Sequence, residues 1–183
     1  MTKPLYYIKT FGCQMNKFDS AEFARFFESA GLAETDDPAA AALIHINTCC
    51  VRQKAEDKFF SFLGEMRRLK EKNASLIIGV SGCIPELRDV AKSNNYVDYV
   101  AGSRAPEKYF GEIEELIAVR TPDAHAVAET APAHGPVSQY LTVIRGCTNM
   151  CAYCVVPHVR GPEISRPAAE IREDALRLAG RGA

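Results

Sequence analysis

The first hundred residues alternate short apolar segments with longer segments of helical periodicity, and this alternation restricts the possible folds more than any other feature. The apolar segments are rich in Ile, Leu, Val and Tyr and predict buried strands at residues 5–9, 43–46, 76–80 and 96–100. The other segments predict helices at residues 20–30, 54–72, 85–92 and 106–119. Strands joined through helices form βαβ units, so residues 1–119 are predicted to be a three-layer α/β domain around a parallel sheet.

The remaining third of the chain differs from this pattern. In residues 120–136, prolines, a glycine and alanines replace the apolar periodicity, which predicts a linker between two domains. Residues 137–183 then contain one apolar strand at 139–144, a loop, and one helix at 168–179. One strand and one helix cannot bury a core of their own, so we expect this region to be the beginning of a second, incomplete domain.

Composition and charge exclude several classes of protein. A net charge of −1, with 25% charged and 47% hydrophobic residues, is ordinary for a globular protein and gives no bulk electrostatic argument for nucleic-acid binding. No apolar run approaches the roughly 18–20 residues that span a bilayer, and no signal peptide is recognised, so we expect no membrane association and a cytoplasmic location. Because the cytoplasm is reducing and the number of cysteines, seven, is odd, the cysteines are more typical of metal ligands, nucleophiles or core residues than of disulfides. His125 and His134, in the predicted linker, are expected to be solvated rather than metal-bound.

Three cysteines share one position relative to the predicted strands. Cys13, Cys49 and Cys83 each follow the end of a strand within a few residues, at intervals of about one βα unit. Since the carboxyl ends of parallel strands lie at one edge of a sheet, we expect the three thiols to converge there as a metal centre. Two other interpretations stay open. The cysteines could be core residues, or they could bind zinc with Cys50 as fourth ligand, although adjacent residues tend to point apart.

Three further cysteines, Cys147, Cys151 and Cys154, form a CxxxCxxC motif directly after the last predicted strand. A cubane iron–sulfur cluster usually has four cysteine ligands, so three thiolates in one loop leave one iron open for a small molecule. This is the logic of the radical S-adenosylmethionine motif, in which an aromatic residue before the last cysteine, here Tyr153, packs beside the adenine. Zinc sites more often use two CxxC pairs or a CxxC with histidines, so we favour radical chemistry.

Both sets of cysteines lie in segments that resemble the methylthiotransferase family. Residues 10–16 (TFGCQMN), 46–49 (INTC) and 81–83 (SGC) resemble the N-terminal domain of that family, and residues 145–166 resemble the start of its radical S-adenosylmethionine barrel. The resemblance extends over nearly the whole chain. The FGCQMN form is most similar to the branch that acts on tRNA isopentenyladenosine next to the anticodon.

The resemblance implies two 4Fe–4S clusters and S-adenosylmethionine as cofactors. The CxxxCxxC cysteines would bind the cluster that cleaves S-adenosylmethionine, and the three strand-end cysteines would bind an auxiliary cluster that carries the sulfur. Cofactor contacts are implied for Tyr153, Arg160 and Arg166. The implied partners are the anticodon stem-loop of tRNA and an electron donor such as flavodoxin or ferredoxin, and we expect a monomer.

The same resemblance implies that the chain is an N-terminal fragment, inactive alone, with residues 137–183 as the first βα unit of a truncated barrel. Alternative substrates, taken by sister branches, are threonylcarbamoyladenosine and an aspartate of a ribosomal protein. A non-catalytic iron–sulfur or zinc-binding module would use the same cysteines. Basic residues on the predicted helix at 54–72 could contact RNA but are more typical of a solvated face: Lys58, Arg67, Arg68, Lys70 and Lys72.

Overall fold

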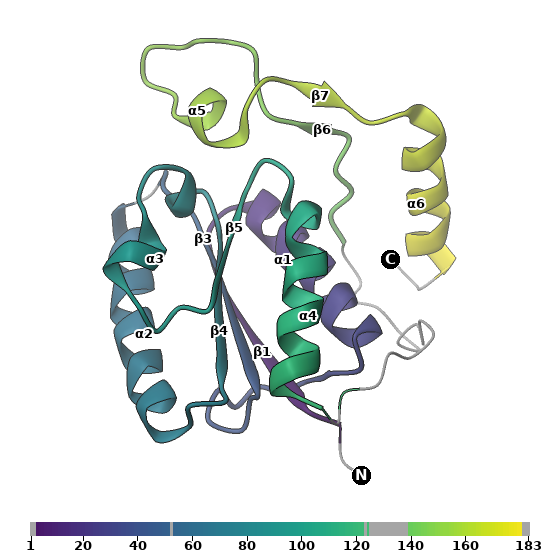
Figure 1. Ribbon diagram of the computed structural model, residues 1–183. Coiled ribbons are helices and arrows are strands. Elements are labelled where there is room, and N and C mark those ends of the chain that lie inside the picture. The colour runs from purple at the N-terminus through teal and green to yellow at the C-terminus, as the bar shows by residue number, and fades with distance from the viewer. Residues whose placement is uncertain (1–2, 52, 123, 125–138, 181–183) are drawn as a thin grey trace.

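A five-stranded sheet forms the middle layer of the structure (Figure 1). The computed structural model describes residues 3–51, 53–122, 124 and 139–180. Neighbouring strands all pair in parallel, in the order β2-β1-β3-β4-β5, which confirms the predicted α/β fold. The strands are β1 (Leu5–Phe11), β2 (Ala33–Glu34), β3 (Leu43–Thr48), β4 (Ile77–Gly82) and β5 (Tyr99–Gly102).

The four longer strands overlap the four apolar segments, but each ends two residues beyond its predicted limit; β3, for example, ends at Thr48 rather than at residue 46. The fourth, β5, also begins three residues later than predicted, at Tyr99. The added residues are mostly polar or glycine, such as Asn47 and Ser81, so apolar patterning does not reveal them. They continue the ladder because their backbones pair with the neighbouring strands. The short β2 was not predicted, since two residues carry no periodic signal.

Helices cover both faces of the sheet and complete the predicted three layers (Figure 1). On one face, α1 and α4 enclose one buried apolar cluster with the sheet, and on the other face α2 and α3 enclose a second. The long α2 begins one residue before its predicted start and ends where predicted. The helical elements are α1 (Gln14–Ser29), α2 (Gln53–Lys72), η1 (Ile84–Glu86), α3 (Val90–Ser93), η2 (Pro106–Tyr109) and α4 (Phe110–Arg120).

The helix predicted at residues 20–30 begins earlier than expected, at Gln14. Its first turn is mostly polar (residues 14–17, QMNK) and therefore shows no apolar periodicity. Cys13 is the N-cap, and the Asn16 side-chain oxygen accepts a hydrogen bond from the Cys13 backbone N–H at 3.3 Å. A capping interaction thus starts the helix where the hydrophobic pattern gives no signal.

The helix predicted at residues 85–92 is wrong as a single element, because it is divided into η1 and α3. Asp89 lies between them as the N-cap of α3, and its carboxylate accepts a hydrogen bond from the Lys92 backbone N–H at 2.9 Å. An aspartate that bonds to backbone groups ahead of it favours a new helix start over continuation of the preceding turn.

A histidine lies at the centre of the sheet. His45, on β3, is fully buried, and its two ring nitrogens lie 2.8 Å from the hydroxyl oxygens of Tyr99 and Ser81. Burial lowers the pKa of His45 from 6.5 to about 3, so the ring is neutral at physiological pH. A neutral imidazole can pair with both hydroxyls, as donor at one nitrogen and acceptor at the other.

In the C-terminal region, residues 139–180, the part that runs from residue 144 to 165 lies above the carboxyl edge of the sheet, and the final helix (168–180) lies to one side (Figure 1). The strand predicted at 139–144 is wrong over most of its length, because Ile144 is its only residue in a strand. That strand is the two-residue β6, Ile144–Arg145, which pairs antiparallel with two other residues. Thr142 is buried, but the apolar Val143 and Ile144 stay 46% and 43% exposed, whereas a barrel would bury such side chains. The first barrel unit is therefore not confirmed. The elements are β6 (Ile144–Arg145), α5 (Val156–Arg160), β7 (Ile164–Ser165) and α6 (Ala168–Gly180).

The predicted helix at 168–179 is present as α6, which buries none of its residues. Most of the predicted linker lies outside the described residues, and so do His125 and His134. Within the described ranges, no helix is long and apolar enough to cross a membrane.

Candidate metal centres at the carboxyl edge of the sheet

Parallel pairing brings Cys13, Cys49 and Cys83 to one edge of the sheet. The last residues of β1, β3 and β4 lie side by side in the register, so the three strands end level with one another. Cys49 and Cys83 are the next residues along the chain, and Cys13 follows two residues after β1. Thiols that are distant in sequence thus meet because the topology aligns the strand ends.

The thiols at this edge interact with one another and with Cys50. A hydrogen bond with the Cys49 thiol, followed by burial, raises the pKa of Cys13 to about 12. The pKa of Cys83 is also raised: its hydrogen bond with Cys49 lowers it, but a hydrogen bond with Cys50 and burial outweigh that effect. The pKa of Cys50 is lowered, mainly by its hydrogen bond with Cys83. The four thiols form one contiguous group, in which a bound metal would displace protons.

Two asparagines that the sequence did not identify as site residues hold α1 against the end of β3. The Asn16 side-chain amide donates hydrogen bonds to the Asn47 side-chain oxygen at 2.8 Å and to the Thr48 carbonyl at 3.0 Å. In return, the Asn47 amide donates to the Asn16 carbonyl at 3.0 Å and to the Ser20 hydroxyl at 3.1 Å. Asn16 also accepts a bond from the Cys13 thiol at 3.3 Å. The sequence feature that could have identified the two asparagines is that each lies within three residues of a candidate cysteine ligand.

Gly82 allows the backbone to reach this arrangement. Its φ is +100°, and a Cβ at this position would lie 2.1 Å from the Thr48 carbonyl oxygen. Only glycine adopts such a backbone and tolerates such an approach without strain. Because Gly82 directly precedes Cys83, the position of that thiol depends on the absence of a side chain at residue 82.

Two buried side-chain polar atoms in the described part of the chain have no hydrogen-bond partner, and both lie at this edge. One is Oγ1 of Thr48, directly before Cys49. The other is Nη2 of Arg160, whose guanidinium lies within electrostatic range of the Cys13 and Cys83 thiols. Buried polar groups are nearly always paired, so both atoms suit a bound group that offers acceptor atoms. Three thiol ligands and two unpaired polar atoms fit an iron–sulfur cluster with its sulfides.

The CxxxCxxC motif occupies the loop between β6 and α5, which projects above the sheet edge (Figure 1). The Cys147 backbone N–H donates to the Gly161 carbonyl at 3.1 Å, and the Cys154 N–H donates to the Cys151 carbonyl at 3.0 Å. Cys151 is exposed, whereas Cys147 and Cys154 are half-buried. Among the described residues, no three His, Cys, Asp or Glu side chains are already placed to hold a single metal ion. A cubane cluster is larger than one ion, so its ligands stand farther apart.

A buried aspartate anchors both flanks of this loop to the sheet domain. The Asp19 carboxylate, on α1, lies 2.9 Å from Arg145 and 3.2 Å from Arg160. The Asp19 side chain is 3% exposed, so the carboxylate is shielded from water; Arg160 is similarly buried, and Arg145 is 20% exposed. The Ser103 hydroxyl adds a hydrogen bond to the Val159 carbonyl at 2.8 Å. These contacts place the CxxxCxxC loop over the edge that holds the other cysteines.

The structure places the three residues implied as cofactor contacts in different surroundings. Tyr153 is 92% exposed. Arg166 donates to the Thr142 carbonyl at 3.0 Å and to the Asp174 carboxylate at 2.7 Å, within its own region. Arg160 is buried against the sheet domain, near the first set of cysteines.

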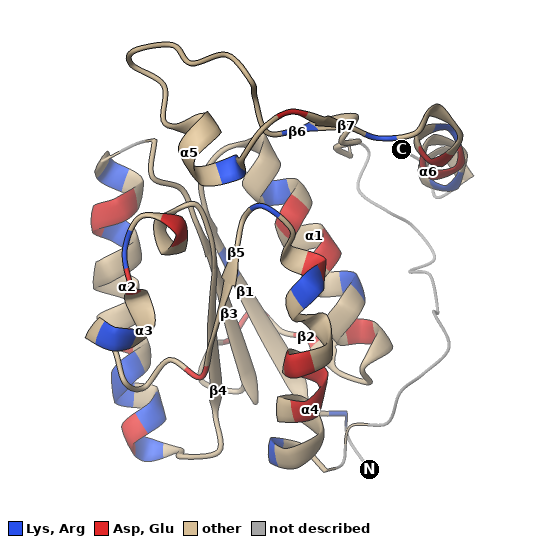
Figure 2. Cartoon of the chain, turned by 45° about the horizontal axis from the view of Figure 1, so that its top comes forward, with Lys and Arg blue, Asp and Glu red and all other residues tan. Residues whose placement is uncertain are grey.

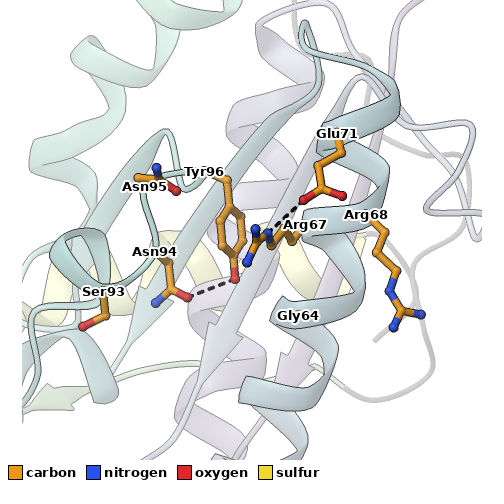
Figure 3. Close-up of a pocket in the computed structure, with 8 residues that line it drawn as sticks. All are labelled: Gly64, Arg67, Arg68, Glu71, Ser93, Asn94, Asn95 and Tyr96. Carbon is orange, nitrogen blue, oxygen red and sulfur yellow. Dashed lines mark hydrogen bonds and ion pairs between the residues drawn. The ribbon is translucent and has the colours of Figure 1, made fainter.

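A cavity of about 440 Å³ lies between α2 and the loop after α3, lined by polar side chains and by no cysteine (Figure 3). Arg67 at its wall is paired with Glu71 at 2.9 Å, and Lys70 on the same helix is paired with Asp98 at 2.7 Å. Acidic and basic residues alternate along α2 (Figure 2). The helix therefore presents mixed charge rather than a uniformly basic face.

The fold and the site together define the class: a three-layer α/β protein with a candidate metal centre of three cysteines at the carboxyl edge of its parallel sheet. The chain belongs to the Uncharacterized protein family UPF0004, whose profile matches residues 5–102. That match contains the sheet and the three strand-end cysteines.

Individual relatives extend the similarity into the CxxxCxxC loop. Three proteins named tRNA-2-methylthio-N(6)-dimethylallyladenosine synthase align over 97–100% of the chain. They come from Syntrophotalea carbinolica (37% identical), Paraburkholderia phytofirmans (39% identical) and Syntrophobacter fumaroxidans (41% identical). The chain spans 43%, 42% and 41% of these proteins, respectively, so it covers less than half of their length.

Proposed function

We propose that the longer protein represented by this chain is a radical S-adenosylmethionine tRNA methylthiotransferase. It would insert sulfur at C2 of N6-isopentenyladenosine next to the anticodon and then methylate that sulfur. The observation that carries the proposal is the convergence of Cys13, Cys49 and Cys83 at the sheet edge over which a separate CxxxCxxC loop is anchored. One cluster suffices to form a radical, whereas sulfur insertion needs a second site to hold the sulfur. The names of the relatives support the tRNA substrate.

Each set of cysteines would hold one 4Fe–4S cluster, with S-adenosylmethionine at the cluster of the CxxxCxxC loop. When bound, these groups supply the radical that removes hydrogen from C2 and the sulfur that replaces it. The contribution of the chain is placement. The buried Asn16 and Asn47 pair fixes α1 to β3, and Asp19 fixes the loop over the sheet edge. Exposed Tyr153 is available to cover the adenine of S-adenosylmethionine, and Arg166, oriented by Asp174, is the second candidate contact. Such positioning is what a multi-cofactor reaction requires from the protein.

The proposal includes the division of the chain into an auxiliary-cluster domain (1–119), a linker (120–136) and the start of the barrel (137–183). It also includes a cytoplasmic monomer that receives electrons from a flavodoxin or ferredoxin. The activity is proposed for the longer protein, and the chain by itself is expected to be inactive.

Metal analysis tests the two-cluster arrangement. We expect roughly eight irons and matching sulfide per full-length chain after anaerobic reconstitution, as two cubanes require. Replacing the three CxxxCxxC cysteines by alanine, or alternatively Cys13, Cys49 and Cys83, should leave roughly four irons in each case. Zinc without sulfide would overturn the proposal in favour of a zinc-binding module.

Nucleoside analysis tests the substrate. The full-length gene should restore methylthio-isopentenyladenosine to tRNA in a host strain that lacks this modification. Restoration of methylthio-threonylcarbamoyladenosine instead, or modification of a ribosomal-protein aspartate, would assign the enzyme to a sister branch.

A further inference from the structure

Arg160 is a buried cation with one end of its guanidinium unpaired. The residue is 8% exposed and lies at the end of α5, in the C-terminal region. Its Nη1 lies 3.2 Å from the Asp19 carboxylate, whereas its Nη2 has no hydrogen-bond partner. A buried N–H group without a partner is rare in proteins and points to a missing acceptor.

The surroundings of this guanidinium identify where the acceptor belongs. It lies within electrostatic range of the thiols of Cys13, Cys50 and Cys83, which come from three different strand ends. Helix α5 packs against η1, which begins directly after Cys83. The other unpaired buried atom of the described residues, Thr48 Oγ1, directly precedes Cys49. Both unpaired atoms are therefore found at the three-cysteine edge.

The local charge favours an anion at the same place. Asp19 is the acidic partner of both Arg145 and Arg160, and neither arginine has a second acidic partner among the described residues. One carboxylate thus faces two guanidinium groups, so the cluster of Asp19, Arg145 and Arg160 has a net positive charge. Buried charge is retained only when it is compensated, and a thiolate-bound iron–sulfur cluster is an anion rich in sulfur acceptors.

We propose that Arg160 donates its Nη2–H to a sulfur atom of the cluster held by Cys13, Cys49 and Cys83, and compensates the negative charge of that cluster. The inference rests on the proposed function. It makes Arg160 a positioning residue of the auxiliary site, supplied by the region that carries the other cluster, rather than a contact for S-adenosylmethionine. Hydrogen bonds to sulfur and net charge both set the reduction potential of such clusters.

The test uses the full-length protein with Cys147, Cys151 and Cys154 replaced by alanine, so that only the auxiliary cluster is loaded. The midpoint potential of this cluster is measured by redox titration followed by EPR. In Arg160→Gln, loss of the cation should make the potential more negative, because the reduced cluster carries the greater negative charge. Arg160→Lys keeps the charge and should shift the potential less. The matched control is Arg104→Gln, which removes an exposed arginine that bonds to the same segment at the His158 carbonyl and should leave the potential unchanged.

A second measurement detects the contact directly in protein that keeps Arg160, with a variant at residue 160 only as its control. Protein labelled with ¹⁵N in the arginine guanidinium should show a weak ¹⁵N coupling to the reduced auxiliary cluster, and Arg160→Lys should abolish it. A loaded cluster with an unshifted potential in Arg160→Gln, or with no ¹⁵N coupling in the labelled protein, would overturn this inference and leave the proposed function intact. Absence of any iron–sulfur cluster in the parent protein would overturn the proposed function itself.

Discussion

Residues 3–122 and residues 139–180 each contain three cysteines that are candidate cluster ligands, and the two regions bring them together by different means. In the first region, strand ends that are far apart in sequence are aligned by a parallel sheet with buried apolar clusters on both faces. In the second, three cysteines lie within eight residues of one loop. A site made by topology depends on the whole domain, whereas a site made by sequence proximity needs only a loop and something to hold it in place.

The second region is held mostly by polar contacts. Helix α6 buries no residue. The buried side chains of the second region come from the part before α6 and include Thr142, Val159 and Arg160. Asp19 and Ser103 of the first region bind this segment directly. We call the contacts of Asp19 and Ser103 with the second region the junction. Substitutions in the sheet should therefore affect the stability of the molecule, whereas substitutions at the junction should affect only the docking of the CxxxCxxC loop.

The largest effect is expected from Gly82→Ala, which tests the dependence of the first site on topology. The new Cβ would meet the Thr48 carbonyl oxygen at a residue whose φ is +100°. Backbone strain and overpacking together should lower the free energy of unfolding by about 4 kcal/mol, measured by urea denaturation.

The matched control is Gly64→Ala. Gly64 lies within α2, and a Cβ added there would have no other atom within 4 Å, so alanine should stabilise the protein by about 0.5–1 kcal/mol. Equal effects of the two substitutions would show that the strand ends are not tightly constrained.

The next effect concerns the junction. Asp19→Asn leaves two arginines without their carboxylate, and breaking a buried ion pair in this way costs about 3 kcal/mol. Hydrogen exchange should become faster in α5 and around the CxxxCxxC loop, while the amides of β3 and β4 stay protected. Asp174→Asn is the control, because its partly exposed pairs with Arg166 and Arg177 lie within the second region and contribute less than about 1 kcal/mol. Unchanged exchange in α5 of Asp19→Asn would contradict the anchoring role of Asp19.

The same comparison explains what the sequence could predict. Apolar alternation predicted the parallel sheet, and the position of Cys13, Cys49 and Cys83 after the strands predicted that they would converge. The patterning could not show that each strand continues through polar residues, nor that Asn16 caps α1, because hydrogen bonds rather than apolar burial decide these details. Most of the predicted strand at 139–144 lacks a partner in the described residues, since a strand depends on neighbours that its own sequence does not specify. The role of Asp19 depends on contacts more than a hundred residues apart and leaves no local signal.

A pH-dependent effect on stability is expected from His45 in the first region. His45 in the folded protein has a pKa of about 3, against 6.5 for an ordinary histidine. Between these two values the unfolded chain binds a proton that the folded chain does not bind. The contribution of His45 to stability is therefore complete above pH 6.5 and falls by about 1.4 kcal/mol for each pH unit below it.

Urea denaturation at several pH values measures this slope, and His45→Gln should reduce it while still offering hydrogen-bonding groups to Ser81 and Tyr99. Parallel pH profiles for the parent protein and His45→Gln would show that the histidine is already protonated or accessible in the folded state.

The smallest effect is expected from Cys50→Ala, which separates the ligands of the first site from their neighbours. Cys50 is half-buried and follows Cys49 directly, and its thiol contacts that of Cys83. If the aligned strand ends define the ligands, Cys50 lies beside the site rather than within it. Its replacement should then change stability by less than about 1 kcal/mol and leave the iron content of the full-length protein at roughly eight. Cys49→Ala is the matched variant and should lower the iron content to roughly four. The opposite result, with iron lost from Cys50→Ala and kept in Cys49→Ala, would make Cys50 the ligand. It would show that the strand topology determines where the site lies but not which of the two adjacent cysteines after β3 binds the cluster.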